Sequence, residues 1–329
     1  MREVTIGAGE CNRRFDKYLL KYFNDAPKSF IYKMLRKKRI KLNGCRAEGG
    51  EILKAGDVAS FYLSDETCAA FMKAAPIPSQ SKGLGIIFED EEILIAIKPA
   101  GLLIHSTKPG DSEDTLTRRM LHYLNRSGSV DFSAESTFTP AFCNRLDRNT
   151  SGIAACGKTL QAVQSLSAMF AKGAARKIYI AAVLGEIGRD GFLGGYILKD
   201  KLKNESVILS SPVPGAKDVA TSFTPIGRGR SATLLSMRLI TGKSHQIRAH
   251  MLSIGHPVLG DPKYGDAKAN FRLKREYGIR CQLLHAQSLV FLEDGGALGK
   301  YCGKEWTAPL PEMFQRFIDS EIELFTMEH

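Results

Sequence analysis

The stretch CNRLDRNTSG, residues 143–152, places Asp147 between Arg145 and Arg148 and ends in Thr-Ser-Gly. A surface salt bridge would need only one arginine and would contribute little to stability. A buried carboxylate beside two guanidinium groups would instead stay ionised at any physiological pH. Which interpretation holds depends on what the rest of the chain is built to bind.

The charge of the chain favours a polyanionic partner. The 329 residues carry a formal net charge of +11. From Arg13 to Lys41 there are eleven Lys and Arg against two Asp, a local net charge of +9, and the rest of the chain is close to neutral. Basic residues collected in one short segment indicate a surface that binds nucleic acid, with an anionic membrane as the weaker choice.

Cysteine usage and hydropathy indicate the compartment. The seven cysteines are scattered, odd in number and without a C-x-x-C pair, so the sequence predicts neither a disulfide framework nor a zinc site. Such thiols are typical of a reducing compartment. The N-terminal residues lack a signal-peptide core, and no run of eighteen apolar residues occurs. We therefore expect a cytoplasmic protein that does not enter a membrane.

The N-terminal segment has the pattern of a small separate unit. Apolar residues at helical spacing predict a helix over residues 13–23 and a second helix after Pro27, capped by Ser29. Residues 40–44 are typical of a strand that ends in an Asn-Gly turn, and residues 52–63 of a pair of strands around another turn.

This unit resembles the alpha-L type RNA-binding domain, a small module first described in a ribosomal small-subunit protein. The resemblance covers roughly residues 12–65 and rests on charge and periodicity. It implies an RNA-binding domain over residues 1–65 whose second helix presents a basic face to structured RNA. The residues of that face are Lys33, Arg36, Lys37 and Lys38. Residues 66–82, with two prolines and little periodicity, are expected to form a linker to a second domain over residues 83–329.

The second domain mixes strands and helices without internal repeats. Apolar runs around an acidic turn predict a hairpin within residues 85–101. Residues 186–215 match no pattern. Because strands outnumber helices and several read as hairpins, the sequence favours the α+β class, with a mostly antiparallel mixed sheet flanked by helices. Further strands are expected at 151–157, 177–185 and 231–242, and helices at 115–124, 159–173 and 244–255.

Most catalytic signatures are absent from the chain. There is no phosphate-binding loop, dinucleotide fingerprint, H-E-x-x-H or G-x-S-x-G motif. His245 and His250 are five residues apart and do not share a helix face, so we expect a structural or RNA-contacting role for both rather than metal binding. The sequence thus predicts no metal and no nucleotide cofactor.

A lone aspartate in a tight loop remains as the candidate for chemistry. Asp147 can act as a nucleophile or base without a cofactor. Ordinary glycosidases need a second carboxylate as general acid, and no comparable motif supplies one. Breaking and remaking a glycosidic bond without releasing the product would need less help from an acid.

Four stretches, in order, resemble the RluA/RluC/RluD-type pseudouridine synthases. NRLDRNTSG, residues 144–152, is similar to that family's H-R-L-D-x-x-T-S-G signature. The other three are IAIKPAGLLIH (95–105), RKIYIAAVLG (176–185) and LITGKSHQIRAHMLSIGHPVLGDPKYG (239–265). Together they span most of residues 85–290, and they imply the pseudouridine synthase fold.

The chain departs from the family pattern at three positions. Asn144 stands where histidine is usual, Ile97 where asparagine is common, and Ser106 where proline is common. None of them is the aspartate, so activity is not put in doubt. Asn144 is expected to affect how the loop is braced or how RNA is held.

The resemblance also implies roles for individual residues. Asp147 would be the nucleophile and Arg248 its ion-pair partner, which would keep the carboxylate charged. Tyr179 would stack on the flipped uracil and is a candidate for accepting the proton from carbon five. Arg145 would enter the RNA helix as the uridine leaves it, and Arg148 would contact phosphate.

Simpler explanations stay open when these residues are taken one by one. Asp147 fits an ion-paired turn, Tyr179 a core strand position, and Arg248 a solvated helix face. Residues 150–152 are expected to shape the loop. Three further residues are expected to be structural: Lys98, Gly101 and His105.

The sequence therefore predicts a monomeric two-domain enzyme that isomerises uridine to pseudouridine in structured RNA. Large-subunit ribosomal RNA is the favoured substrate and transfer RNA the second choice. The alternatives are a non-catalytic RNA-binding or ribosome-assembly factor with the same fold, and a glycosidase that releases uracil.

Overall fold

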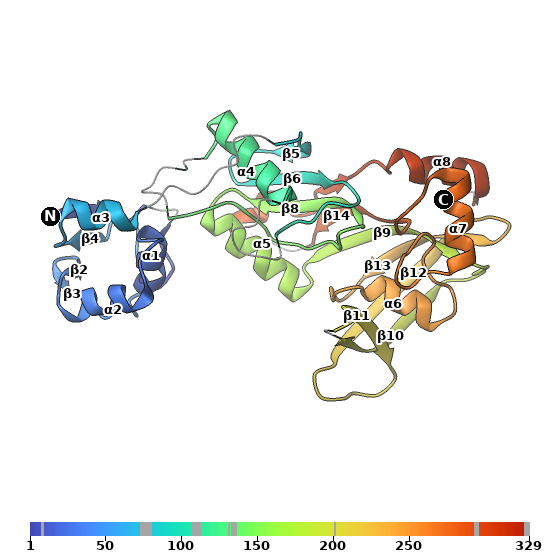
Figure 1. Cartoon of the computed structure of the whole chain (residues 1–329), viewed down its shortest axis with the longest axis horizontal. Coiled ribbons are helices and arrows are strands. Elements are labelled where there is room, and N and C mark those ends of the chain that lie inside the picture. Colours follow the sequence, from blue (N-terminus) through green and yellow to red (C-terminus); the bar gives the residue numbers. More distant parts are fainter. Residues whose placement is uncertain are drawn as a thin grey trace.

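Two units with separate hydrophobic cores make up the described part of the chain (Figure 1). The computed structural model describes residues 1–7, 10–72, 81–106, 113–130, 132, 137–200, 202–292 and 296–325. The N-terminal unit lies at one end of the molecule. Helices α7 (Ala267–Tyr277) and α8 (Glu312–Glu321) lie at the other end. The large sheet of the second unit lies between the N-terminal unit and these two helices.

The N-terminal unit is a four-stranded antiparallel sheet with helices packed against it. Its strands are β1 (Arg2–Thr5), β4 (Val58–Phe61), β2 (Ile40–Leu42) and β3 (Cys45–Arg46), side by side in that order. Helices α1 (Phe15–Tyr22) and α2 (Lys28–Arg36) confirm the two helices expected from periodicity. The largest buried side chains of the core are Phe15, Tyr18, Tyr22, Phe23 and Phe61.

Some expectations for this unit are wrong in detail. Helix α2 begins at Lys28 with Pro27 in the N-cap position, so Ser29 lies inside the helix and does not cap it. Pro27 has the extended backbone typical of the residue before a helix, so the helix has already begun when the chain reaches Ser29. Over residues 52–63 only β4 forms, because Ile52 makes a single bridge to Arg14 instead of a strand.

The segment expected to be a linker begins with a helix. Helix α3 (Asp65–Phe71) is capped by Ser64, whose hydroxyl accepts a hydrogen bond from the Thr67 amide at 3.2 Å. Cys68 on α3 is buried in the N-terminal core, so this stretch cannot be a free connector. Residues 73–80 of the expected linker lie outside the described residues.

The second unit is built on a 12-stranded mixed sheet among the described residues, which confirms the α+β class. Among the described strands, the only two that pair in parallel are β8 (Ser151–Gly157) and β14 (Leu284–Phe291). The strands follow the order β11 (Glu205–Leu209), β10 (Gly191–Asp200), β12 (Lys217–Arg228), β13 (Ala232–Leu239), β9 (Ala175–Leu184), β14, β8, β6 (Ile93–Lys98) and β5 (Gly85–Glu89). Short strands β7 (Ala141–Phe142), β15 (Glu305–Thr307) and β16 (Glu323–Leu324) pair with β8, β14 and β12.

Helices cover both faces of this sheet. Alternation along β9 separates the two sides, since Tyr179 and Ala181 belong to one hydrophobic cluster and Ile180 and Ala182 to another. The expected helices are confirmed as α4 (Leu116–Ser127), α5 (Leu160–Lys172) and α6 (Gln246–Ser253), and a 3₁₀ turn, η2, spans Gly296–Tyr301. Among the described residues, no helix is both long and apolar enough to span a membrane.

The stretch that matched no pattern forms the hairpin β10–β11. Most of its residues are exposed or half-buried, so the sequence shows only a weak alternation of apolar and polar side chains. The hairpin extends from the end of the sheet beside α6 (Figure 1). Strand β12 tolerates Pro225 because the register shifts between Pro225 and Gly227.

Candidate active site

The loop that carries Asp147 runs between the paired strands β7 and β8. The Asn144 side chain fixes its first half, because its Nδ2 donates to the Ile153 carbonyl at 3.1 Å and its Oδ1 accepts from the Ala155 amide at 2.8 Å. The Thr150 amide donates to the Asp147 carbonyl at 3.1 Å and closes the turn. These bonds fix the backbone of the loop on both sides of Asp147.

Lys98 holds the backbone of this loop and of the turn after β6 through hydrogen bonds. Its buried ammonium donates to three carbonyls, those of Pro99 at 2.9 Å, Leu102 at 2.7 Å and Arg148 at 2.8 Å. Burial lowers the pKa of Lys98 to about 7, while the charge of Asp147 acts in the opposite direction. The expected structural role of Lys98 is confirmed.

The Thr-Ser-Gly end of the loop passes close to β14. Gly152 has φ +119°, and a Cβ at this position would lie 2.2 Å from the Ala286 carbonyl oxygen. Ser151 hydrogen-bonds His285 Nδ1 at 2.8 Å, and Gln282 Nε2 donates to Thr150 Oγ1 at 3.2 Å. These contacts explain why the loop ends in small and hydroxyl-bearing residues.

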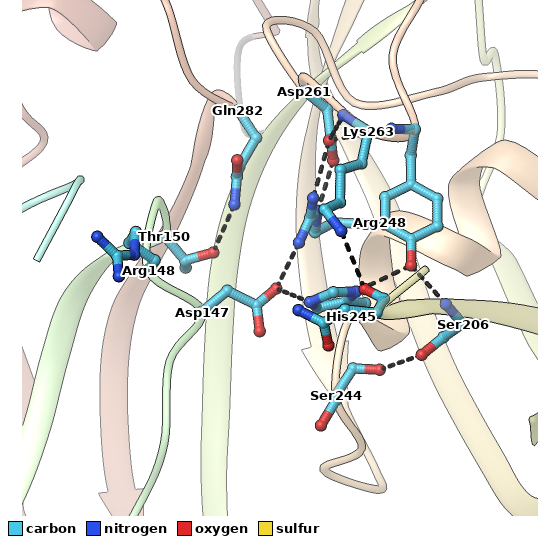
Figure 2. A network of polar contacts seen from close by, with 12 residues as sticks. Asp147, Arg148, Thr150, Ser206, Ser244, His245, Arg248, Asp261, Lys263 and Gln282 are labelled. Atoms are coloured by element: carbon cyan, nitrogen blue, oxygen red, sulfur yellow. Dashed lines mark hydrogen bonds and ion pairs between the residues drawn. The ribbon is translucent and has the colours of Figure 1, made fainter. Parts of the chain in front are cut away.

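Arg248 on α6 holds Asp147 from the opposite side of the site (Figure 2). Its Nη1 donates to Asp147 Oδ2 at 2.9 Å, and its Nε and Nη2 donate to the two oxygens of Asp261 at 2.6 and 2.9 Å. Burial alone would lower the pKa of Arg248, but its hydrogen bonds to Asp261 and the charges of both carboxylates raise it. Arg248 therefore stays charged.

Asp261 anchors this arrangement and has no solvent exposure. Besides Arg248 it accepts hydrogen bonds from the amides of Lys263 at 2.9 Å and Tyr264 at 3.1 Å. The guanidinium of Arg248 also lies over the Tyr264 ring, 4.7 Å from its centroid. Because Asp261 binds Nε and Nη2 together, the guanidinium is held in one orientation and its Nη1 is directed at Asp147.

His245 also approaches Asp147, toward the same carboxylate oxygen that Arg248 binds (Figure 2). Its Nε2 is 3.9 Å from Asp147 Oδ2, and its Nδ1 hydrogen-bonds the Tyr264 hydroxyl at 2.8 Å. That hydroxyl accepts from the Ser206 amide on β11 at 2.6 Å, so it can donate its own proton to His245. Burial lowers the pKa of His245 even though Asp147 opposes the shift, which keeps the imidazole neutral at pH 7.

A cleft of about 480 Å³ opens beside Asp147. Tyr179 on β9 lines it and is 5% exposed. Burial, followed by the negative charge of Asp147, raises the pKa of the Tyr179 hydroxyl. The cleft thus places an ion-paired carboxylate and a neutral aromatic ring next to a space large enough for a nucleoside.

Comparison with known proteins agrees with this geometry. The sequence model of the family described as RNA pseudouridylate synthase matches residues 92–253. An RNA pseudouridine synthase of Mycoplasma pneumoniae is 30% identical over 286 residues, which cover 86% of each chain. The chain belongs to the RluA/RluC/RluD-type RNA pseudouridine synthases. It is therefore an isomerase that acts on RNA.

Two further comparisons extend over most of the synthase. The ribosomal large subunit pseudouridine synthase D of Xanthomonas campestris is 29% identical over 328 residues, 97% of this chain and 92% of that protein. The solved structure of human RNA pseudouridylate synthase domain containing 4 superposes with a TM-score of 0.56 at 21% identity, covering 73% of this chain and 94% of that one. That structural likeness confirms the pseudouridine synthase fold.

The structure brings three of the predicted site residues together. Asp147 and Tyr179 line one cleft, and the predicted ion pair of Asp147 with Arg248 is present. Arg248 is only 4% exposed, so the alternative of a solvated helix face is wrong. Arg145 lines the same cleft from an exposed position.

The other predicted residues lie elsewhere. Arg148 is exposed and forms an ion pair with Glu113 at 2.9 Å, on the outer side of the loop. The four basic residues of the N-terminal unit are exposed at the end of α2 and after it, outside the cleft: Lys33, Arg36, Lys37 and Lys38. Within the described ranges, no group of three His, Cys, Asp or Glu is placed to hold a metal ion.

Sequence reasoning missed two residues of the site. Asp261 lies in the G-D-x-x-Y-G part of a family block, and its position in that block was the available signal. His245 was considered only with His250, which is buried and bonded to Thr221. The backbone of His245 is left-handed, with φ +57°, which turns its ring toward the cleft instead of along the helix.

Proposed function

We propose that this synthase converts uridine to pseudouridine in large-subunit ribosomal RNA, with Asp147 as the nucleophile. The observation that supports this most is the pairing of Asp147 with Arg248 in a cleft that also contains Tyr179. A carboxylate that a fixed guanidinium keeps ionised is a competent nucleophile without a cofactor. The similarity to the ribosomal large subunit pseudouridine synthase D of Xanthomonas campestris supports this substrate, and transfer RNA is the second candidate.

The reaction rearranges bonds without net addition or loss of atoms. The bond from uracil N1 to ribose C1′ breaks, the base turns in the cleft, and C5 bonds to C1′. The C5 proton leaves and N1 gains a proton. Asp147 attacks either the ribose or the base in this scheme, and both routes place the same carboxylate beside the extruded nucleoside.

Tyr179 is proposed to hold the uracil by stacking. A tyrosine hydroxyl is protonated at neutral pH, and the raised pKa of Tyr179 moves it further from ionisation, so the ring carries no charge that would repel the base. Stacking of a base on an aromatic ring contributes about 1–3 kcal/mol, which offsets part of the cost of extrusion. Accepting the C5 proton is a second role that a Tyr179→Phe variant can test.

The two arginines of the loop are proposed to contact RNA. Arg145 is exposed at the rim of the cleft, where a guanidinium can occupy the space that the uridine leaves. Arg148 would have to release Glu113 before it contacts a phosphate. The basic surface of α2 is proposed to dock the RNA, and the enzyme is proposed to work as a cytoplasmic monomer without a metal or nucleotide cofactor.

Release of tritium from RNA labelled at uracil C5 tests the proposal. Large-subunit ribosomal RNA should lose label to water, transfer RNA should not, and no free uracil should appear. Asp147→Asn should abolish release while the circular dichroism spectrum stays unchanged. Release that persists in Asp147→Asn would exclude this nucleophile, and free uracil would indicate a glycosidase. Tight RNA binding with no release from either RNA would favour the non-catalytic binding factor.

A further inference from the structure

Strand β9 carries a second polar side chain into the cleft. Side chains two residues apart on a strand point to the same face, about 7 Å from each other. Lys177 therefore shares a face with Tyr179, and both line the cleft. Further along this face Ala181 and Val183 enter the apolar core, so Lys177 lies where the core ends and the cleft begins.

Lys177 has no anionic partner within the described part of the chain. No hydrogen bond or ion pair of its ammonium is present there, and its neighbours are the Phe170 ring, 5.8 Å from Nζ, and Gly242. A Cβ on Gly242 would lie 3.2 Å from Nζ, so the glycine leaves the ammonium accessible from the cleft. The neighbouring charge is a second cation, Lys243, which lines the same cleft.

The charge of Lys177 is half-buried, whereas Lys243 is exposed to solvent. Burial, and then the like charge of Lys243, lower the pKa of Lys177. Among the described residues, no carboxylate offsets these effects on Lys177. A half-buried cation beside another cation costs stability, and an anion between them would remove that cost.

We propose that Lys177 and Lys243 form a subsite for the phosphate of the extruded uridine nucleotide. The uracil would lie on Tyr179, and the phosphate would lie one strand repeat away, between the two ammonium groups. Lysine suits this task because it acts as a flexible point charge toward phosphate oxygens. That the nucleotide is a uridine rests on the proposed function, whereas the recognition of a phosphate rests on the two lysines.

Uridine 5′-monophosphate and uridine are the probes that test this subsite. Ligand-detected NMR on the full chain should show that the monophosphate binds about tenfold more tightly than the nucleoside, as expected for one charge-assisted contact. Lys177→Gln and Lys243→Gln should each reduce this preference and leave uridine binding unchanged. Lys177→Arg should retain most of it. Lys268→Gln removes an equal charge on α7, outside the cleft lining, and should have no effect.

Two results would overturn the subsite. One is equal binding of monophosphate and nucleoside by the unmodified chain. The other is a preference for the monophosphate over uridine that survives in Lys177→Gln. The melting temperature of this variant, equal to or above that of the parent, would show that it is folded. Neither measurement needs turnover, so a monophosphate preference without tritium release would leave the subsite standing and remove only the proposed reaction.

Discussion

Arg248 is the residue on which the geometry of the site depends most directly. It joins Asp147 in one loop to Asp261 in another through three hydrogen bonds, and neither Arg248 nor Asp261 has appreciable contact with water. The two arginines next to Asp147 in sequence play no part in this arrangement. The carboxylate is held by a guanidinium a hundred residues away.

Asp261→Asn should both destabilise the protein and slow the reaction. The change leaves Arg248 buried with one carboxylate instead of two, and breaking a buried ion pair costs about 3–5 kcal/mol. Urea unfolding should show a loss of about that size, and tritium release should fall because Arg248 no longer holds a fixed direction. Asp218→Asn, at an exposed position, is the control. Equal stability of Asp261→Asn and parent would show that Asp261 does not anchor Arg248.

Replacing Tyr179 should separate stacking from proton transfer. Tyr179→Phe keeps the ring and should bind RNA as the parent does, whereas Tyr179→Leu should bind more weakly by about 1–3 kcal/mol. Filter binding on an Asp147→Asn background measures the affinities without turnover. Loss of tritium release in Tyr179→Phe would assign the C5 proton to the hydroxyl. Equal affinity of the Leu and Phe variants would argue against stacking.

The close pairing of β8 and β14 explains the small residues after Asp147. The two strands are parallel neighbours, with Ser151 opposite His285 and Gly152 opposite Ala286. The Asp147 loop ends where this pairing begins. Any change in the spacing of the two strands will therefore shift the carboxylate.

Gly152→Ala should be strongly destabilising. Its Cβ would meet the backbone of Ala286 at 2.2 Å, and its φ of +119° is one that alanine rarely adopts. We expect a loss of more than about 2 kcal/mol in urea unfolding. Gly188→Ala has open space around the new Cβ and should change stability by less than about 1 kcal/mol. A parent-like midpoint for Gly152→Ala would mean that β8 can move away from β14.

Protonation of His285 should weaken the pairing of β8 and β14 in acid. Burial lowers the pKa of His285 to about 4, although its contact with the Ala308 carbonyl opposes the shift. Between pH 6.5 and 4 the unfolded chain takes up a proton that the folded chain does not, so stability falls as pH falls. The loss approaches about 3 kcal/mol near pH 4 and is absent above pH 7.

Unfolding at several pH values measures this effect. His285→Gln should lose part of the dependence of stability on pH between 6.5 and 4, whereas His122→Gln on α4 should retain it. The same acid-side slope in His285→Gln and parent would show that His285 is not its source.

Helices and strands were predictable to different degrees. Apolar residues at helical spacing made α4 and α5 readable from the sequence. The structure adds that the side chains of Thr115 and Thr159 cap them. The hairpin β10–β11 could not be read, because its half-exposed residues lack a strict alternation. Helix α3 was missed because its segment was predicted to be a linker on the basis of two prolines that follow the helix.

The two units of the molecule differ in charge. The basic residues at the end of α2 and after it belong to a unit with its own aromatic core, and the cleft belongs to the other unit. Among the described residues, Glu10 and Arg13 contact Thr137 and connect the units. The boundaries at residues 65 and 83 stay a prediction, although α3 packs with the first unit.

Removing the basic surface should weaken RNA binding and its dependence on salt. Changing Lys33, Arg36, Lys37 and Lys38 together to Gln should lower the slope of log K against log salt by roughly 2 to 4, since each phosphate contact contributes about 0.9. Affinity measured from low to moderate salt tests this. The control with equal charge loss changes Lys217, Lys268, Lys274 and Arg280 to Gln. Equal slopes in the two variants would show that α2 is not the docking surface.

The four family stretches, in their order along the chain, were enough to predict the fold class, the family and Asp147 as the candidate nucleophile. The concentration of positive charge was enough to predict a polyanionic partner. A motif depends only on residues that are close in sequence, and a net charge only on a sum over residues. The tertiary structure alone decided that Asp261 anchors Arg248, that His245 turns toward Asp147, and that Lys177 lies in the cleft without an anionic partner among the described residues. Those facts depend on how separate strands and loops meet. A linear pattern records which side chains are present and leaves open the distances between them, and distance determines the interaction of charges.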